Sequence, residues 1–268
     1  MFSLQGKTVV VTGGGKGIGR GIARAMARCG AQVVVSGRDA AALEATAEEL
    51  RALDVAALAV QGDITRADDR QRLVDATLER FGTIDGWVNN AGSAAPGDVG
   101  PLDSIDEGKW DRVVDLNLKA AFFSAQAAAR AMARGGSIVN ITSRSASYPN
   151  PGTGHYGAAK AALENLTRTM AAEWGHRGIR VNAVAPGVVM TDELARTLDT
   201  EGRIRRQVET VPLQRLGTPD DIGPLCAYLV SDESAWTTGA LIPVNGGSFV
   251  PMGYLSYLHK VNRRAPAA

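Results

Sequence analysis

Two residues with complementary proton chemistry, Tyr156 and Lys160, lie four positions apart in an alanine-rich stretch of the chain. Residues at this spacing share one face of an α-helix. A phenol is neutral at pH 7, with an ordinary pKa of about 10, but a nearby ammonium group favours the phenolate and lowers that pKa. The pair therefore predicts a tyrosine that acts as a general acid or base. Because the same spacing also arises by chance in helices, this interpretation needs support from other residues.

Ser143 and Asn117 supply that support. Ser143 follows the predicted strand Ser137–Thr142 and so lies at the carboxyl edge, where doubly wound sheets bind ligands. Its hydroxyl can hydrogen-bond a substrate oxygen and stabilise developing charge. Asn117 lies inside the helical pattern Trp110–Ala133, where asparagine competes with helical hydrogen bonds. We expect a local helix defect there, holding a water that links Lys160 to solvent and returns the proton lost by the phenol.

Glycines are concentrated directly after the first predicted strand, Thr8–Thr12, and a helix follows them. Such a turn lets the backbone approach a pyrophosphate, and the helix N-terminus attracts negative charge. A glycine-rich turn alone could be purely structural, but its place between strand and helix predicts a dinucleotide site. The candidate cofactor-binding residues in this turn are Gly13, Gly15, Lys16, Gly17, Ile18 and Gly19.

The end of the second predicted strand bears on the choice between NADP and NAD. NAD-selective folds place a carboxylate there for the ribose 2′-hydroxyl, whereas here Gly37 occupies that place and Arg38 follows. Arg38 and Lys16 together would hold a 2′-phosphate, so we favour NADP as the cofactor. NAD stays possible, with Arg38 stacked on the adenine or solvated and Asp39 tolerating the 2′-hydroxyl.

Asp63 comes just after the third predicted strand and Ile64 follows it. The Asp63 carboxylate is placed to accept a hydrogen bond from the adenine amino group. Capping of the helix that begins near Arg66 explains this residue equally well. We retain both Asp63 and Ile64 as candidate cofactor-binding residues.

These side chains need a parallel sheet to position them. Several valine runs lack polar alternation, as expected when helices cover both faces of a sheet, and alternating strands and helices indicate βαβ units. The fold class is therefore α/β, a single-domain doubly wound Rossmann sheet. Predicted strands are Thr8–Thr12, Gln32–Ser36, Ala56–Gln61, Ile84–Asn89, Ser137–Thr142, Arg180–Ala185 and Leu241–Asn245. Predicted helices are Gly17–Cys29, Ala40–Leu53, Asp68–Phe81, Trp110–Ala133, Tyr156–Trp174 and Asp220–Val230.

No repeat or linker divides the chain, so we expect one domain over residues 1–247 and an appended tail at 248–268. Residues 188–215, here called the substrate loop, interrupt the strand–helix rhythm. They should select the substrate together with Arg144–Gly154, and the tail is a further candidate. The apolar tail should pack over a neighbouring subunit or the pocket rim, or else be partly disordered. His155, next to the catalytic tyrosine, is predicted to be a loop residue that precedes the helix.

Composition narrows the function classes. The 268 residues carry 29 basic and 28 acidic side chains, a balance that argues against nucleic-acid binding. The three histidines show no metal-ligand spacing, so no metal site is expected. Cys29 and Cys226 lie far apart in the sequence, each within an apolar helical pattern. We predict that both are free, buried thiols in a reducing compartment. Neither a signal peptide nor a membrane-spanning run is evident, which predicts a cytoplasmic protein.

In order along the chain, these motifs resemble those of the short-chain dehydrogenase/reductase family, from about Leu4 to Gly247. The resemblance implies a seven-stranded Rossmann sheet and hydride transfer between a nicotinamide and a ketone or secondary alcohol. By position, Tyr156 resembles the family's acid/base, Lys160 its partner and nicotinamide-ribose ligand, Ser143 the substrate-orienting serine and Asn117 the proton-relay asparagine. The motifs are Thr12-Gly-x-x-x-Gly-x-Gly, Asn89-Asn90-Ala91-Gly92, Asn117, Ser143, Tyr156-x-x-x-Lys160 and Pro186-Gly187.

The resemblance also implies further cofactor contacts and an assembly. It suggests a homotetramer, joined through the helices that contain Asn117 and Tyr156 and through the carboxyl-terminal strand region. Val189 and Thr191 match positions near the carboxamide end of the cofactor. The added candidate cofactor residues are Asn90, Ala91, Gly92, Tyr156, Lys160, Pro186, Gly187, Val189 and Thr191.

Alternative functions remain open at this point. One branch of the family reduces 3-oxoacyl groups on acyl carrier protein using two helix arginines; Arg130 matches one, but Ala172 stands at the other place. We therefore favour a small, alicyclic or steroid-like ketone or secondary alcohol as the partner. A non-catalytic dinucleotide sensor is a second alternative, although all four catalytic positions are filled. Enoyl reductases space their tyrosine and lysine more widely than Tyr156 and Lys160.

Overall fold

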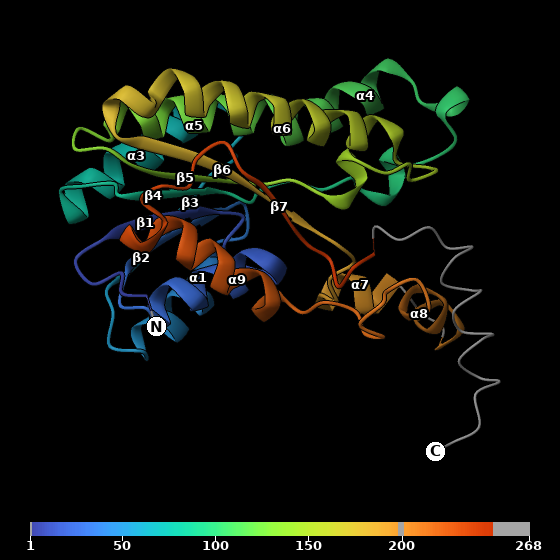
Figure 1. Ribbon diagram of the computed structural model, residues 1–268, viewed down its shortest axis with the longest axis horizontal. Helices are drawn as coiled ribbons and strands as arrows, with labels where there is room; N and C mark the ends of the chain where they lie inside the picture. Colours follow the sequence, from blue (N-terminus) through green and yellow to red (C-terminus); the bar gives the residue numbers. More distant parts are fainter. Residues whose placement is uncertain (1, 198–200, 249–268) are drawn as a thin grey trace.

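A computed structural model describes residues 2–197 and 201–248 of the chain (Figure 1). These residues form a seven-stranded sheet whose paired strands are all parallel. The strand order is β3-β2-β1-β4-β5-β6-β7, so the predicted doubly wound Rossmann fold is confirmed. The strands are β1 Thr8–Thr12, β2 Gln32–Gly37, β3 Ala57–Gln61, β4 Gly86–Asn89, β5 Gly136–Ile141, β6 Ile179–Pro186 and β7 Leu241–Val244.

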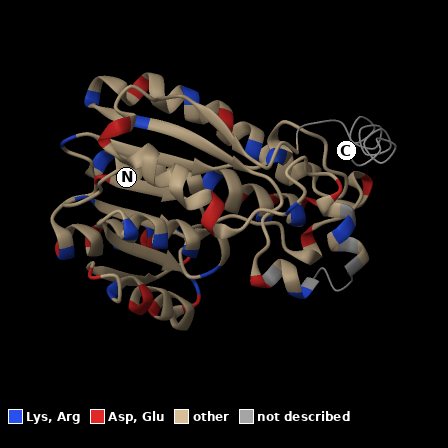
Figure 2. Cartoon of the chain, turned by 60° about the horizontal axis from the view of Figure 1, so that its bottom comes forward, with Lys and Arg blue, Asp and Glu red and all other residues tan. Residues whose placement is uncertain are grey.

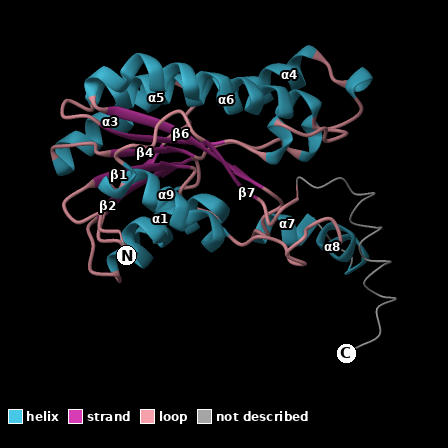
Figure 3. Cartoon of the chain, viewed as in Figure 1, coloured by secondary structure: helices cyan, strands magenta, loops and turns pink. Residues whose placement is uncertain are grey.

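Helices cover both faces of the sheet (Figures 1 and 3). Buried side chains of α1, α2 and α9 share one apolar cluster, and those of α3, α5 and α6 share a second cluster on the other face. A π-helical turn, Asp115–Lys119, joins α4 to α5. The helices are α1 Gly17–Arg28, α2 Ala40–Arg51, α3 Ala67–Phe81, α4 Glu107–Val114, α5 Ala120–Ala131, α6 Gly154–Trp174, α7 Asp192–Thr197, α8 Glu201–Val208 and α9 Pro219–Val230.

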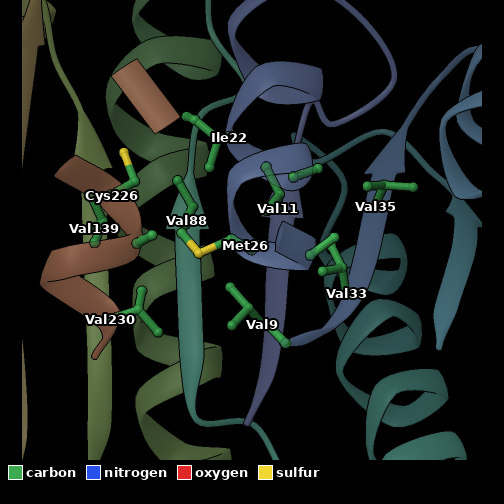
Figure 4. Packing of buried hydrophobic residues seen from close by; sticks show 14 of the residues in the cluster. Val9, Val11, Ile22, Met26, Val33, Val35, Val88, Val139, Cys226 and Val230 are labelled. Atoms are coloured by element: carbon green, nitrogen blue, oxygen red, sulfur yellow. The ribbon is translucent and has the colours of Figure 1, made fainter. Parts of the chain in front are cut away.

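The valine runs of the central strands explain this two-sided burial. Val9 and Val11 of β1 belong to the cluster with α1 and α9, whereas Val10 belongs to the opposite cluster. Figure 4 shows Val9 and Val11 beside Ile22 and Met26 of α1. Because successive strand residues point to opposite faces, a strand covered on both sides reads as a continuous apolar run. The chain passes from β3 back across β1 to β4, which leaves a crevice at the carboxyl ends of β1 and β4.

Close packing of two helices fixes the start of α1. A Cβ added at Gly21 would lie 2.5 Å from Pro219 Cβ and 2.7 Å from the Pro219 carbonyl oxygen. A Cβ at Gly223 would lie 2.8 Å from the Gly21 carbonyl oxygen. Only glycine at both places permits this approach of α1 to α9. The crossing therefore sets where the N-terminus of α1 points.

Predicted and observed boundaries agree within two residues for every predicted strand and for all but one predicted helix. The exception is Trp110–Ala133, which was expected as one helix and is instead α4, the π-helical turn and α5. The substrate loop contains α7 and α8, and a bridge between Val189 and Gly217 closes its base. Apart from Ser248, the predicted tail at 248–268 lies outside the described residues.

The surface carries mixed charge. In Figure 2, Lys and Arg are interspersed with Asp and Glu, the pattern of solvated helical faces. Within residues 2–197 and 201–248, no helix is both long and apolar enough to cross a membrane, and no cluster of His, Cys, Asp and Glu could hold a metal ion. The tryptophans differ widely in exposure: Trp87 of β4 is fully buried, whereas Trp236, before β7, is fully exposed.

Candidate active site

A cleft of about 330 Å³ opens at the carboxyl ends of β1, β4, β5 and β6. It brings together most of the predicted cofactor residues and three of the four predicted catalytic ones. The lining residues are Gly13, Lys16, Gly17, Ile18, Gly19, Asn90, Ala91, Gly92, Ser93, Ile141, Thr142, Ser143, Tyr156, Lys160, Pro186, Gly187, Thr191 and Asp192. Six predicted residues are not in this lining: Gly15, Arg38, Asp63, Ile64, Asn117 and Val189.

The glycine-rich turn has the backbone shape that the sequence predicts. Gly13 and Gly17 adopt left-handed conformations, with φ of 64° and 51°. A Cβ at Gly19 would collide with the Gly13 carbonyl, so this close turn requires glycine there. Gly15 packs against the start of α2 rather than on the cleft, since its Cβ would lie 3.2 Å from the Leu43 nitrogen. The turn delivers the N-terminus of α1 to the cleft, where anions are favoured.

Residues after β4 anchor this turn. Asn90 Nδ2 donates hydrogen bonds to the Thr12 carbonyl at 2.9 Å and to the Gly13 carbonyl at 3.2 Å. Thr12 Oγ1 in turn accepts from the backbone nitrogens of Asn90 and Ala91, at 3.0 and 3.1 Å. The segment that matches Asn89–Gly92 therefore ties β4 to the end of β1 and shapes one wall of the cleft.

Lys16 and Arg38, predicted to act together, lie in different settings. Lys16 Nζ donates to Asp39 Oδ2 at 2.5 Å, and Asp39 Oδ1 caps α2 by accepting from the Ala42 nitrogen at 3.1 Å. Hydrogen bonding to Lys16 lowers the pKa of Asp39. The Arg38 side chain is exposed and makes no hydrogen bond or ion pair with any described residue. Of these two predicted phosphate ligands, Lys16 is therefore paired with Asp39, whereas Arg38 has no partner among the described residues.

Asp63 does not cap a helix, so that alternative is wrong. α3 begins at Ala67 with Arg66 as its N-cap. The Asp63 Oδ1 atom instead accepts from the Thr65 nitrogen at 3.0 Å and from Thr65 Oγ1 at 2.7 Å, which folds the loop after β3. Ile64 presents its carbonyl to Arg70 Nη1 at 2.8 Å and packs against the second apolar cluster.

Tyr156, Ser143 and Lys160 meet at the centre of the cleft. α6 places the half-buried Tyr156 phenol in hydrogen-bond contact with Ser143. Ser143 Oγ accepts from the Ser145 nitrogen at 3.1 Å, so its own hydrogen remains available to a phenol or substrate oxygen. Lys160 is 3% exposed; its Nζ donates to the Ile141 carbonyl at 3.0 Å and lies 5.7 Å from the centre of the Tyr156 ring.

The expected lowering of the phenol pKa is wrong for the protein's own groups. Burial raises the pKa of Tyr156, and the hydrogen bond from Ser143 opposes that rise. Burial also lowers the pKa of Lys160 from 10.5 to about 8. The physical reason is desolvation, which disfavours both the phenolate and the ammonium. The Lys160 ammonium is hydrogen-bonded to a backbone carbonyl and lies beside the face of the Tyr156 ring.

Asn117 lies in a helix defect, as the sequence predicts. It occupies the π-helical turn between α4 and α5 and is fully buried. Its Nδ2 atom donates to the Ser93 carbonyl at 2.7 Å and to the Val113 carbonyl at 2.9 Å, while its Oδ1 has no partner among the residues that the structure describes. A Cβ at Gly92 would lie 2.6 Å from Asn117 Oδ1 and 2.9 Å from Lys160 Nζ. Gly92 therefore separates the orphaned amide oxygen from the ammonium.

The two predicted residues of the substrate loop differ in position. Thr191 lines the cleft, and its Oγ1 begins α7 by accepting from the Leu194 nitrogen at 3.1 Å. Val189 is buried instead, with its Cγ2 atom 3.3 Å from where a Gly217 Cβ would stand. It supports the base of the loop and does not face the cleft.

Some residues were missed or misplaced by sequence reasoning. The cleft also includes Ser93, Ile141, Thr142 and Asp192, each next to a motif residue, so adjacency was the available signal. His155 is not a loop residue: it is the second residue of α6, buried, with its ring 6.4 Å from that of Trp110. Helix caps were the missing information, because α6 begins two residues earlier than predicted.

Comparisons with known proteins agree with this geometry. A family model described as Enoyl-(Acyl carrier protein) reductase matches residues 13–248. The L-rhamnose 1-dehydrogenase (NAD(P)(+)) of Azotobacter vinelandii is 41% identical, covering 91% of this chain and 97% of that one. A 3-oxoacyl-[acyl-carrier-protein] reductase of Staphylococcus epidermidis is 37% identical, covering 91% and 99%.

Solved structures show the same relationship. The crystal structure of a putative short-chain alcohol dehydrogenase from Sinorhizobium meliloti 1021 matches with a TM-score of 0.87 and 39% identity, over 92% of this chain and 98% of that one. These relatives and this solved structure each cover more than nine-tenths of this chain. The chain belongs to the short-chain dehydrogenase/reductase family of nicotinamide-dependent oxidoreductases.

Proposed function

We propose that this enzyme transfers a hydride between NADP and a small ketone or secondary alcohol, with Tyr156 as the general acid/base. One observation carries the proposal: the Tyr156 phenol, the Ser143 hydroxyl that is hydrogen-bonded to it and the buried Lys160 all line one cleft. Phosphate-binding, substrate-orienting and proton-transferring groups thus lie together at the switch point of the sheet.

The residues present fit a dinucleotide. The left-handed glycines and the N-terminus of α1 suit a pyrophosphate, and the space that a Gly92 Cβ would fill lies beside Lys160. When bound, the dinucleotide supplies or accepts the hydride. Lys160 would hold the nicotinamide ribose. The cleft walls that contain Asn90 and Pro186 would enclose the rings of the cofactor.

Proton transfer then follows from the chain's own groups. Ser143, fixed by the Ser145 nitrogen, donates its hydrogen bond to the reacting oxygen and disperses charge there. The Tyr156 phenol gives its proton to that oxygen in reduction and takes one in oxidation. The orphaned Asn117 Oδ1 is placed to accept from a water near Lys160, which would return the proton to the site.

We favour NADP because the exposed Arg38 guanidinium is free to bind a 2′-phosphate. Lys16 contributes only by exchanging its bond to Asp39 for the phosphate. The same Asp39 carboxylate would accept from the 2′-hydroxyl of NAD, so the two cofactors compete at one pair of residues.

A substitution at the phenol tests the proposed function. Tyr156→Phe removes only the hydroxyl, so turnover of ketones with NADPH should fall by at least about 10³-fold, while cofactor affinity measured by calorimetry stays within about twofold. Phe2→Leu, at a residue outside the cleft lining, serves as a control for preparation and assay of a variant protein. Near-normal turnover by Tyr156→Phe would contradict the assignment.

A substrate panel separates the alternative activities. Acyclic, alicyclic and steroidal ketones and alcohols are compared with 3-oxoacyl groups on coenzyme A and on acyl carrier protein. Preference for the carrier-bound substrate would favour the 3-oxoacyl reductase alternative, which the relative from Staphylococcus epidermidis suggests; Arg130 is exposed on α5, and the exposed Ala172 of α6 offers no second cation. Cofactor binding without turnover on any member would favour the sensor.

Assembly and setting complete the proposal. We infer a homotetramer formed through α5, α6 and the β7 edge. Phe123 on α5 is 38% exposed, and no strand within the described residues pairs with the outer edge of β7, which supports this assembly. Sedimentation measures the assembly directly, and a monomer would overturn this part. A cytoplasmic setting suits Cys29 and Cys226, which form no disulfide.

A further inference from the structure

Arg144 directly follows Ser143 but is not among the residues that line the cleft. It opens a short 3₁₀ turn, Arg144–Ala146, whose N-cap is Ser143. Its Nε donates to the Ser248 carbonyl at 2.6 Å, and its guanidinium carbon lies 5.4 Å from the centre of the Tyr148 ring. One planar side chain thus binds the segment after β7 and stacks within the loop that carries the serine. Lysine would make these two contacts less well, because its compact ammonium lacks the extended planar surface and the fork of donors of a guanidinium.

The segment after β7 is itself held against the end of the substrate loop. The Gly246 carbonyl accepts from the Leu213 nitrogen at 3.2 Å. Gly246 and Gly247 are both left-handed, with φ of 63° and 86°. A Cβ at Gly246 would lie 2.6 Å from Val211 Cγ1, so this contact leaves no room for a side chain.

The same segment also reaches the cleft. A Cβ at Gly187, which lines the cleft, would lie 2.8 Å from Asn245 Cβ. Asn245 Oδ1 accepts from the Gly247 nitrogen at 3.0 Å and holds the turn in shape. Residues 245–248 therefore contact the substrate loop and Gly187, which lies in the cleft wall after β6. Through Ser248 they also contact Arg144, in the loop that carries Ser143.

We infer that Arg144 is a positioning residue that couples the substrate loop to Ser143. The path runs from Leu213 through Gly246 and Ser248 to the Arg144 guanidinium, and from its backbone to the adjoining serine. Movement of the substrate loop is thereby transmitted to the group that orients the reacting oxygen. The inference rests on the proposed function, because it takes Ser143 as that group.

The kinetic test compares Arg144→Ala and Arg144→Lys with Arg28→Ala, an exposed arginine at the end of α1. Arg144→Ala should lower kcat/KM for the substrate by about tenfold or more, because small misplacements of reacting groups are costly, while cofactor affinity stays within about twofold. Arg144→Lys should recover only part of this loss, and added guanidinium ion should recover part of the activity of Arg144→Ala. Arg28→Ala should match the wild type.

The pH profile distinguishes positioning from general damage. The Ser143 hydrogen bond lowers the pKa of Tyr156, so a displaced serine should move the rising limb of alcohol oxidation to higher pH in Arg144→Ala. An equal loss of cofactor affinity and melting temperature, with an unmoved pH profile, would overturn the inference in favour of a merely structural role.

Amide hydrogen exchange gives a readout that needs no turnover. In Arg144→Ala, exchange should quicken at both ends of the path, near Leu213 and near Ser145, and remain as in the wild type in α1. Unchanged exchange at Leu213 would overturn the coupling. If the wild type turned over no ketone or alcohol, the proposed function would fall, and the exchange result would still decide whether Arg144 links the two loops.

Discussion

At the scale of single residues, Gly92 has no room for a side chain. A methyl group there would lie 2.6 Å from Asn117 Oδ1 and 2.9 Å from Lys160 Nζ. Gly92→Ala should therefore displace the lysine or the asparagine and reduce kcat by about 10²-fold, measured with saturating cofactor. Gly97→Ala is the matched control, since nothing lies within 4 Å of its added Cβ. Equal activity of the two variants would show that this spacing has no catalytic role.

We expect the buried ammonium of Lys160 to lower the free energy of unfolding. Burial lowers the pKa of Lys160 to about 8 in the folded protein, against 10.5 for an ordinary lysine. The unfolded chain thus binds more protons between these values, and the free energy of unfolding rises with pH across that window. Below about pH 8, the buried charged lysine lowers the free energy of unfolding by roughly 3 kcal/mol. The raised pKa of Tyr156 acts in the opposite direction above about pH 10, where stability should fall.

Lys160→Met should consequently be inactive yet more stable than the wild type at about pH 7, with the difference shrinking toward about pH 9.5. Urea unfolding at several pH values measures it. Lys119→Met, at an exposed site paired with Asp115, controls for loss of a lysine. A pH-independent difference, or a less stable Lys160→Met at neutral pH, would show that burial does not strain this lysine.

The sequence was informative about which residues meet and uninformative about their ionisation. Motif order placed Tyr156, Ser143 and Lys160 in one cleft, because strand ends of a parallel sheet converge. The sign of the phenol pKa shift was missed, since it depends on how deeply the ring is buried. The partner of Lys16 was missed too, because Asp39 lies a strand and a helix away in sequence.

At the scale of elements, the crossing of α1 and α9 requires glycine. Gly21→Ala would press a methyl group onto the Pro219 backbone at 2.7 Å, so unfolding free energy should drop by about 1–3 kcal/mol. Cofactor affinity should fall with it, because the N-terminus of α1 turns away from the cleft. Thermal unfolding and calorimetry measure the two effects.

Gly108→Ala provides a control of opposite sign. Gly108 is the second residue of α4, and its added Cβ would lie 3.3 Å from Arg112 Nη1 and 3.4 Å from Asp106 Oδ1, both side-chain ends on the surface. Alanine at this helical position should stabilise by up to about 0.5–1 kcal/mol. If Gly21→Ala were also neutral or stabilising, the close crossing would not set the position of α1.

Element prediction failed where one extra residue enters a helix. Apolar periodicity over Trp110–Ala133 continues through the π-helical turn, so the pattern cannot show the break. Only the asparagine in its middle indicated a defect. The start of α6 was placed two residues late for a related reason: Thr153 makes no side-chain cap, and the sequence offers no strong N-terminal signal there.

At the scale of the whole molecule, the cofactor should stabilise the fold by mass action. Because the Arg38 side chain bonds to none of the described residues, Arg38→Ala should reduce the rise in melting temperature given by NADP and raise the Michaelis constant for NADP by about tenfold or more. The effect of NAD should stay nearly unchanged. Arg51→Ala, at an exposed ion pair of α2, is the control. Equal changes with both cofactors would show that Arg38 does not read the 2′-phosphate.

Overall topology was predictable because it depends on few rules. Alternation of strands and helices, with right-handed crossovers, leaves little choice beyond a doubly wound sheet. What those rules do not fix is how the carboxyl-terminal segment closes the site. The contacts of Gly246 and Ser248 join residues more than thirty positions apart, and no periodicity records such pairings.

Trp87 in β4 is fully buried and Trp236 is fully exposed, so the intrinsic tryptophan fluorescence of the protein reports on both its interior and its surface. Acrylamide will quench emission from Trp236 while sparing that of Trp87, whose indole nitrogen donates to Asn89 Oδ1 at 2.8 Å. Emission that survives the quencher is blue-shifted and moves to the red only when the sheet opens. Trp110, at 46% exposure, adds to the quenchable emission. The proposed assembly beside β7 would cover Trp236 and reduce the quenchable fraction, whereas unfolding would expose Trp87.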